Sequence, residues 1–277
     1  LYHEHKKGVK AGYAKFETFP VWSLPLKHPV NMAYEAATAD LNDRNMIDSF
    51  HLEAYGKSAV NYNRDLEVFP IVKNILQKIT GKEIYKSPTD MGVNSIGECI
   101  TDDKVVQEAA KKEILRRYYK ALTDEKLSLD NDDISKRIKL LINELEIKEK
   151  VLPVITQARK KEKKKKKVSM AIELEGGTII TGRETKLLTP AASLIINSIK
   201  YLSGISDEIN LLSPSVLNPI LKLKKESLNN SDKLNLNDVL IALSICSATN
   251  PIIENALKAL KKLNNCDAHA SYIVPKN

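Results

Sequence analysis

A run of basic residues separates two parts of this sequence that differ in their secondary-structure pattern. Residues 159–167 hold eight positive charges and one negative charge, and so account for nearly all of the formal charge of +8. Upstream, residues 102–163 have helical periodicity, whereas downstream the alternation around Gly176 and Gly177 predicts a β-hairpin. A like-charge block is typical of a solvated helix end that continues into a linker, so we predict a domain boundary at 165/166.

The remaining composition limits the classes of partner. The basic run lacks the interleaved aromatic and base-reading residues of a nucleic-acid-binding surface. No apolar run approaches the ~20 residues that span a bilayer. Cys99, Cys246 and Cys266 form no C-x-x-C pair, which is typical of free thiols in a reducing compartment. We therefore predict a cytoplasmic protein with a small-molecule ligand and without a specific nucleic-acid or membrane partner. The sequence leaves a homo-oligomer open.

We predict a mixed α/β (α+β) fold in three regions. Residues 1–84 begin with a helix that Gly8 ends, followed by an alternating segment at 11–20 that is typical of a strand. A helix followed by a strand is half of an α/β unit, so this region is predicted to be the C-terminal part of a nucleotide-binding-like α/β domain. Because the first helix is entered in its middle, we expect the chain to be the C-terminal part of a longer protein.

The second region, 85–165, is predicted to be helical, and the third, 166–277, to be a small layered α/β domain with a hairpin and a final strand at 266–274. Residues 42–48 are predicted to form a polar loop. Helices are expected at 31–41, 65–79, 102–122, 132–145, 148–163, 190–203, 214–228, 236–247 and 251–263.

The densest group of functional side chains lies between residues 27 and 65 and is extended by the polar loop at 84–97. No helix or strand period sorts these residues into a core face and a solvent face, which is typical of loops that bind a phosphate or another polar ligand. The alternative is a polar surface built from helix caps and turns. The candidate ligand-binding residues are Lys27, Asn31, Asn61, Asn63, Arg64, Lys86, Thr89 and Asp90.

Two histidines and four aspartates have the chemistry for further roles. His28 and His51 are candidates for general acid/base groups, because the pKa of imidazole is near neutrality. Carboxylates are ligands of Mg²⁺, so four aspartates are candidate magnesium ligands; they are Asp40, Asp43, Asp48 and Asp65. A zinc site is not predicted, because the chain has neither H-E-x-x-H nor P-C-x-x-C. It also has no phosphate-loop motif of its own.

Several long runs resemble an uncharacterised bacterial family called domain of unknown function eighteen-forty-six. These runs are residues 25–31, 34–41, 45–48, 50–55, 60–65, 86–94 and 248–251. The resemblance implies a Gly-rich, phosphate-loop-like stretch just before the position that matches Leu1, and hence ATP or another nucleotide with Mg²⁺ as a cofactor. Some family members are described as ATP-dependent peptidases, but this sequence has no nucleophile triad or metal motif for that activity.

Two hypotheses follow. The first is a nucleotide-dependent (ATP-type) enzyme that acts on a polar or anionic small substrate. The second is a non-enzymatic nucleotide-sensing or scaffold protein that forms subunit interfaces. Geometry separates the two, because an enzyme would gather the candidate residues in one cavity, whereas a scaffold would spread them over caps and surface ion pairs. The residues that decide are Lys27, His28, Asp48, His51, Asn63 and Arg64.

Overall fold

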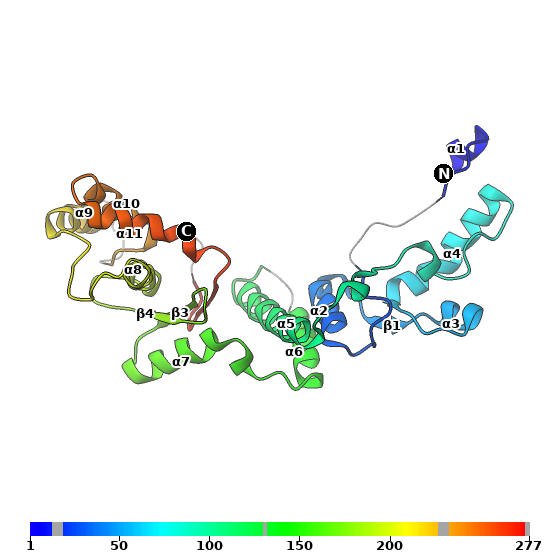
Figure 1. Ribbon diagram of the computed structural model, residues 1–277, viewed down its shortest axis with the longest axis horizontal. Helices are drawn as coiled ribbons and strands as arrows, with labels where there is room; N and C mark the ends of the chain where they lie inside the picture. Colours follow the sequence, from blue (N-terminus) through cyan, green and yellow to red (C-terminus); the bar gives the residue numbers. More distant parts are fainter. Residues whose placement is uncertain (13–18, 130–131, 227–232, 275–277) are drawn as a thin grey trace. The chain divides into compact units, whose positions relative to one another are not determined.

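The computed structural model describes residues 1–12, 19–129, 132–226 and 233–274, and shows a mixed α+β fold. The chain divides into two compact units, Leu1–Val151 and Leu152–Asn277. This division differs from the three regions expected at 1–84, 85–165 and 166–277, because the long helix α5 (Asp103–Lys126) packs on α2 (Pro29–Ala37) (Figure 1). The helix α7 (Pro153–Lys165) likewise packs on strand β3 (Ser169–Glu173), and so belongs to the second unit.

The first unit is mainly helical. The helices predicted at 65–79, 102–122 and 132–145 are present with slightly different bounds. Besides α2 and α5, its helices are α1 (Tyr2–Lys6), α3 (Ser49–Tyr55), α4 (Asn63–Thr80) and α6 (Asp132–Glu144), with short 3₁₀ turns at Ala39–Leu41, Thr89–Met91, Ile96–Cys99 and Glu149–Val151. The strand expected at 11–20 falls largely outside the described residues.

The prediction of a loop at 42–48 is wrong in part, because strand β1 (Asn45–Ile47) lies within it. β1 pairs antiparallel with β2 (Val60–Tyr62), with Asn45 opposite Tyr62. Three-residue strands are too short for alternation to be recognised, and tertiary contacts stabilise this pair instead. The Tyr62 side chain is completely buried. The side-chain amide of Asn45 donates through Nδ2 to the backbone oxygen of Asn31 at 2.7 Å.

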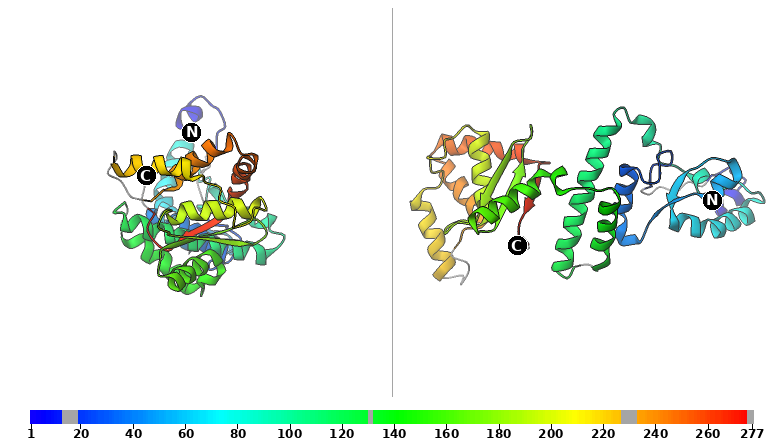
Figure 2. Two further views of the ribbon diagram at one scale, coloured as in Figure 1. Left: turned by 90° about the vertical axis from the view of Figure 1, so that its left-hand side faces the viewer. Right: turned by 90° about the horizontal axis from the view of Figure 1, so that it is seen from below.

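The second unit is built around a three-stranded antiparallel sheet in the order β4-β3-β5. β4 spans Ile179–Arg183 and β5 spans Asp267–Ala270. Helix α7 packs on one face of the sheet and α8 (Pro190–Leu202) on the other (Figures 1 and 2). Three further helices complete the core around α8, namely α9 (Pro214–Glu226), α10 (Leu236–Ser247) and α11 (Pro251–Lys258).

The predicted hairpin is confirmed as β3 and β4, joined across Gly176 and Gly177. Both glycines have positive φ, 88° and 83°, which the tight turn requires and which side chains disfavour. The basic run is confirmed as an exposed helix end, since α7 ends at Lys165 and Lys166 adopts a left-handed conformation. The run then leads directly into β3 and not into a link between domains.

We predict that Gly182→Ala will destabilise the protein. A Cβ at this position of β4 would lie 2.5 Å from Leu194 Cα and 2.6 Å from the backbone oxygen of Pro190 in α8. Because both are backbone atoms, the strand and helix must separate, at a cost of about 2 kcal/mol or more. Urea denaturation would measure this loss of unfolding free energy. Arg183→Ala is the control, because Arg183 is exposed and its replacement should change the unfolding free energy by less than about 0.5 kcal/mol. An equal effect of the two changes would contradict the close packing.

Candidate functional site

The candidate residues fall into two groups in the first unit. Most of those between residues 27 and 65 make local contacts that hold α2, β1, β2 and α4 in place. A smaller group comes together where α3 meets the loop around the 3₁₀ turn Thr89–Met91. This second group consists of Asp48, His51, Lys86, Thr89 and Asp90. The two groups are described in turn.

His28 caps helix α2. Its Nδ1 accepts a hydrogen bond from the Val30 amide at 3.3 Å, so in the neutral ring the proton lies on Nε2. Nε2 is 2.9 Å from Asp103 Oδ1 at the start of α5. The hydrogen bond from Gln107, with a smaller contribution from His28, lowers the pKa of Asp103. His28 therefore joins the first turns of two helices, and both of its ring nitrogens are in use.

Asn31 and Asp43 are buried and have internal partners. Asn31 is 0% exposed; its Oδ1 accepts the Val21 amide at 2.7 Å and its Nδ2 donates to the backbone oxygens of Val21, Leu24 and Pro25. The carboxylate of Asp43 accepts two hydrogen bonds from Arg64, from Nε at 3.1 Å and Nη2 at 3.2 Å. These residues fix the irregular segment before α2 and the approach to α4.

The remaining members of this first group also have local contacts. Lys27 forms an ion pair with Glu144 at 2.6 Å. Asn61 Oδ1 accepts the amide of the next residue, Tyr62, and Asn63 Oδ1 accepts the Arg44 amide at 2.7 Å. Asp65 lies in the first turn of α4, where a carboxylate interacts favourably with the helix dipole.

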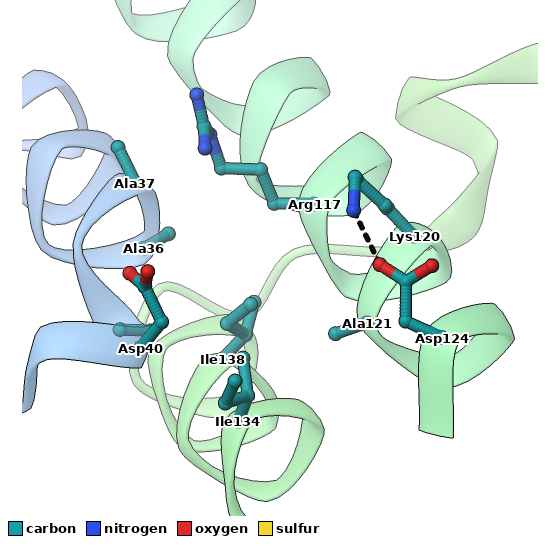
Figure 3. Close-up of a pocket in the computed structure, with 10 residues that line it drawn as sticks. Ala36, Ala37, Asp40, Arg117, Lys120, Ala121, Asp124, Ile134 and Ile138 are labelled. Atoms are coloured by element: carbon teal, nitrogen blue, oxygen red, sulfur yellow. Dashed lines mark hydrogen bonds and ion pairs between the residues drawn. The ribbon is translucent and has the colours of Figure 1, made fainter. Parts of the chain in front are cut away.

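Asp40 lies in a small cleft of about 180 Å³ beside α2, α5 and α6 (Figure 3). Asp40 comes from the turn after α2, and Lys120 and Asp124 line the cleft from α5, where they form an ion pair. Arg117, also on the cleft wall, pairs with Glu113 at 2.9 Å. The cleft is smaller than the 300–1,000 Å³ typical of small-molecule sites, and the cations on its wall already have acidic partners.

Asp48 organises the second group. It is 0% exposed and caps helix α3, because its Oδ1 accepts the His51 amide at 3.0 Å. Its Oδ2 accepts both the amide and the hydroxyl of Thr89, at 3.2 and 2.5 Å. Three hydrogen bonds satisfy this buried carboxylate without a metal ion. Asp48 thereby joins α3 to the loop that carries Lys86 and Asp90.

His51 is held against this loop through one ring nitrogen. Its Nδ1 lies 3.0 Å from Ser87 Oγ and 3.8 Å from Asp90 Oδ1. The amide of Asp90 donates to the same Ser87 hydroxyl, which fixes that hydroxyl beside Nδ1 of His51. Within the described part of the chain Nε2 has no hydrogen-bond partner.

Asp90, Tyr55 and Lys86 surround the histidine. Asp90 Oδ2 accepts hydrogen bonds from the Tyr55 hydroxyl at 2.9 Å and from the amides of Lys86 and Ser87. The bond to Asp90 is the main cause that raises the pKa of Tyr55. The Lys86 ammonium lies 5.7 Å from the centre of the Tyr55 ring, within cation–π range. A positive charge is thus held over Tyr55, whose ring centroid lies 4.8 Å from that of His51.

Three residues of this site were not among the predicted site residues, namely Trp22, Tyr55 and Ser87. The Trp22 ring lies edge-on to His51 with a centroid separation of 6.4 Å, and its buried Nε1–H has no acceptor among the described residues. Tyr55 is one helical turn beyond His51, a spacing that places both on one face of α3. That spacing was the available signal for Tyr55, whereas nothing in the sequence connects Trp22 to His51.

The four candidate magnesium ligands do not form one cluster. Asp43 pairs with Arg64, Asp48 accepts hydrogen bonds from His51 and Thr89, and Asp40 lines the cleft beside α5. Among the described residues, no three His, Cys, Asp or Glu side chains gather in a way that would hold a metal ion.

Comparison with known proteins places the chain in a family. A family model described as domain of unknown function DUF1846, N-terminal, matches residues 1–146, and the corresponding C-terminal model matches residues 150–277. The chain therefore belongs to the DUF1846 family, whose function is uncharacterised. The boundary between the two matches lies near that between the two units of the structure, at 151/152.

Bacterial relatives named UPF0371 protein share about half of their residues with this chain. The relative from Clostridium botulinum (strain Alaska E43) is 52% identical over 286 residues, which cover 100% of this chain and 57% of the relative. The relative from Corynebacterium urealyticum is 50% identical over 99% of this chain and 55% of its own length. The one from Fusobacterium nucleatum is 50% identical over 100% and 58%. The chain thus spans just over half the length of these relatives.

Within the described residues, none of the helices combines the length and the apolar character needed to cross a membrane.

We predict that Glu35 makes folding stability depend on pH. Glu35 lies half-buried on α2, and its Oε2 accepts the Asn45 amide at 2.9 Å. Burial is the main cause that raises the pKa of Glu35 above its ordinary value of 4.5, and Glu144 adds to the rise. The folded state therefore holds this proton more tightly than the unfolded state, so Glu35 reduces stability as the pH rises through about 4.5 and above.

Glu35→Gln keeps a side-chain acceptor for Asn45 and removes the titration. We expect this variant to gain stability relative to the wild type at pH 7 but not at pH 3.5, as measured by urea denaturation across that range. Glu144→Gln should weaken the dependence on pH to a smaller extent, because it removes the neighbouring charge; it also removes the ion pair with Lys27, so only the change with pH is compared. A difference between Glu35→Gln and wild type that did not vary with pH would contradict the shifted pKa.

Proposed function

We propose that His51 is the acid/base group of a nucleotide-dependent enzyme that acts on a polar or anionic small substrate. Of the six residues chosen to separate the two hypotheses, only Asp48 and His51 come together. The other four are engaged in helix caps, turns and ion pairs, which is the arrangement expected of a scaffold; they are Lys27, His28, Asn63 and Arg64. The enzyme proposal therefore rests on the one-sided anchoring of the His51 ring. Ser87 and Asp90 face Nδ1, whereas Nε2 has no partner among the described residues and so is available to exchange a proton with a substrate. A histidine whose ring is oriented through Nδ1, with Nε2 left for the substrate, is a common arrangement in general acid/base catalysis.

Lys86 and Trp22 complete the proposed substrate site. The Lys86 ammonium, beside Tyr55, provides a positive charge for an anionic substrate group. The orphan Nε1–H of Trp22 is a buried donor next to His51, and a buried donor without an acceptor is unfavourable until one is bound. A substrate oxygen would supply that acceptor. Asp90 and Asp48 act as positioning residues, because they hold the loop and not the substrate.

The nucleotide in this proposal rests on the family resemblance alone. ATP or another nucleotide with Mg²⁺ is the proposed cofactor, and no residue of this chain is assigned to it. Because the chain spans about half the length of its relatives, the activity of the whole protein is part of the proposal. We also propose a cytoplasmic location, which fits the free thiols of this chain.

The test has two steps. A thermal-shift screen of the intact protein against nucleotides, with and without Mg²⁺, should identify a nucleotide that adds about 2.7 kcal/mol of stability at 100 times its Kd. Phosphate release from that nucleotide is then followed with candidate small substrates. We expect His51→Asn to lower kcat by about 10²–10⁴-fold with little change in KM, and Lys86→Met mainly to raise KM.

His28→Asn is the matched comparison, because His28 is equally buried but caps a helix. This change can keep the helix cap but loses the contact of Nε2 with Asp103, so it should lower the unfolding free energy by about 1 kcal/mol and leave kcat near the wild-type value. If no nucleotide stabilises the intact protein, or if His51→Asn and His28→Asn affect kcat equally, the proposal is wrong.

A second candidate function, a non-enzymatic nucleotide-sensing or scaffold protein, is supported by an exposed apolar stripe on α4. Val68, Ile71 and Ile75 are 45%, 63% and 52% exposed and are spaced to lie along one face of the helix. Apolar residues gathered on one surface mark interaction sites more often than scattered ones do. The candidate partner is a second copy of the chain, which would make a homo-oligomer.

Under this second function we predict that Ile71→Glu shifts the protein to a smaller species in size-exclusion chromatography with light scattering. A charge in the middle of a desolvated apolar contact is costly, so the dissociation constant should rise at least about tenfold. Gln77→Glu, at an exposed polar position away from the stripe on the same helix, is the control and should leave the species unchanged. A wild-type protein that is monomeric at all concentrations would exclude self-association through this stripe.

A further inference from the structure

The second unit, Leu152–Asn277, has a cavity of its own. It has a volume of about 650 Å³, within the 300–1,000 Å³ range typical of small-molecule sites. It lies along the edge strand β4 and is completed by α8, by Lys161 from α7 and by the loop after α8. The residues that carry the argument below are Lys161, Thr181, Asn197, Lys200, Tyr201 and Asp207.

Lys200, which lines this cavity, is a buried cation without an acidic partner. Its side chain is on α8 and the residue is only 7% exposed. Its Nζ donates one hydrogen bond, to the backbone oxygen of Asp207 at 2.9 Å. An ammonium group has three N–H donors, so two remain for other acceptors. Within the described residues no carboxylate forms an ion pair with Lys200.

A second buried lysine in the same unit, Lys224, has the acidic partner that Lys200 lacks within the described residues. Lys224 is 5% exposed, and its ammonium forms an ion pair with Asp238. Burial removes water from a charged group, and the loss must be offset by an opposite charge or by several hydrogen bonds. Lys224 has its counter-charge within the fold. For Lys200 the position open to a counter-charge is the cavity that it lines.

The other groups around the cavity define the chemistry of an occupant. Lys161 is half-buried and brings a second ammonium group, also without an ion pair among the described residues. Tyr201 contributes a hydroxyl, which lies 3.3 Å from Thr178 Oγ1. Asn197 contributes an amide whose Nδ2 donates to the backbone oxygen of Thr181. Asp207 is the single acidic residue in the cavity lining, beside the two lysines. Because its carboxylate repels negative charge, the lining favours a ligand with one anionic group over a ligand with many. Isoleucines 179, 180 and 205 provide apolar wall.

We propose that this cavity is a binding site for a small hydroxylated molecule that carries one phosphate or carboxylate group. The anionic group binds Lys200, with Lys161 adding positive charge on the cavity wall, and the hydroxyl groups bind Tyr201, Asn197 and Asp207. This site is independent of the proposed function at His51, since it is made entirely by the second unit. Phosphate and carboxylate share the chemistry that the two lysines recognise, and the experiment distinguishes them.

The test uses the ¹⁵N-labelled chain and two probes, ribose 5-phosphate and gluconate, titrated to millimolar concentrations. We expect at least one probe to shift the amide signals of Thr181 and Asn197 in a saturable way. Lys200→Met should raise the dissociation constant of that probe at least tenfold. In the absence of a probe this variant should be at least as thermally stable as the wild type, because it removes an uncompensated buried charge.

Two control variants separate this site from general charge effects. Lys224→Met also removes a buried lysine, but it leaves Asp238 without its partner, so it should lower the melting temperature and change the probe's dissociation constant less than twofold. A double change of Lys164 and Lys165 to Gln reduces the charge of the exposed basic run and should likewise leave binding within twofold.

The proposal is overturned if neither probe shifts the signals of Thr181 and Asn197. It is also overturned if the shifts map to residues 163–167 and disappear with the double change, or if Lys200→Met binds as tightly as the wild type. Should Lys200→Met fail to fold, Lys161→Met at the half-exposed rim replaces it, with an expected weakening of at least threefold. The mapping of shifts on the wild-type protein does not depend on either variant.

Discussion

The buried carboxylate of Asp48 is the interaction on which the candidate site in the first unit depends. It has no solvent contact, and the amide and hydroxyl groups of His51 and Thr89 satisfy its oxygens. One carboxylate oxygen caps helix α3, and the other binds the loop that contains Thr89. Both segments that build the site are therefore fixed to a single side chain. A buried acceptor of this kind is strongly unfavourable when its donors are lost, which gives the loop a defined position relative to His51.

Much of the regular structure follows from local signals in the sequence. The glycine pair at 176 and 177 and the alternation around it were sufficient for the hairpin β3–β4, because a tight turn needs two residues with positive φ. The helices expected from residues 190 and 251 begin there, each at a proline that follows a capping side chain, Thr189 and Asn250. The short strands β1 and β2 had no such signal, since their pairing depends on contacts with residues far away in the sequence.

The candidate site was harder to predict, because the residue types that bind ligands are those that cap helices and close turns. His28, Asn31 and Asp43 have the composition of a binding site, yet their polar atoms are directed at the backbone or at Arg64. His51, Thr89 and Asp90 do meet, but a separation of about forty residues hides their proximity. Lys200 was not among the candidates, because a lysine within an apolar helix shows its burial only in three dimensions.

The basic run has an evolutionary consequence. Four lysines are exposed and form no ion pair within the described residues, namely Lys163, Lys164, Lys165 and Lys166. Lys167, in contrast, pairs with Glu184, the residue that follows β4. The positive charges at this helix end interact with the helix dipole collectively, so no individual lysine is required. Homologues can therefore gain or lose residues between Glu162 and Lys166 with little effect on the fold, and we expect this stretch to vary in length while the residue that meets Glu184 keeps its charge.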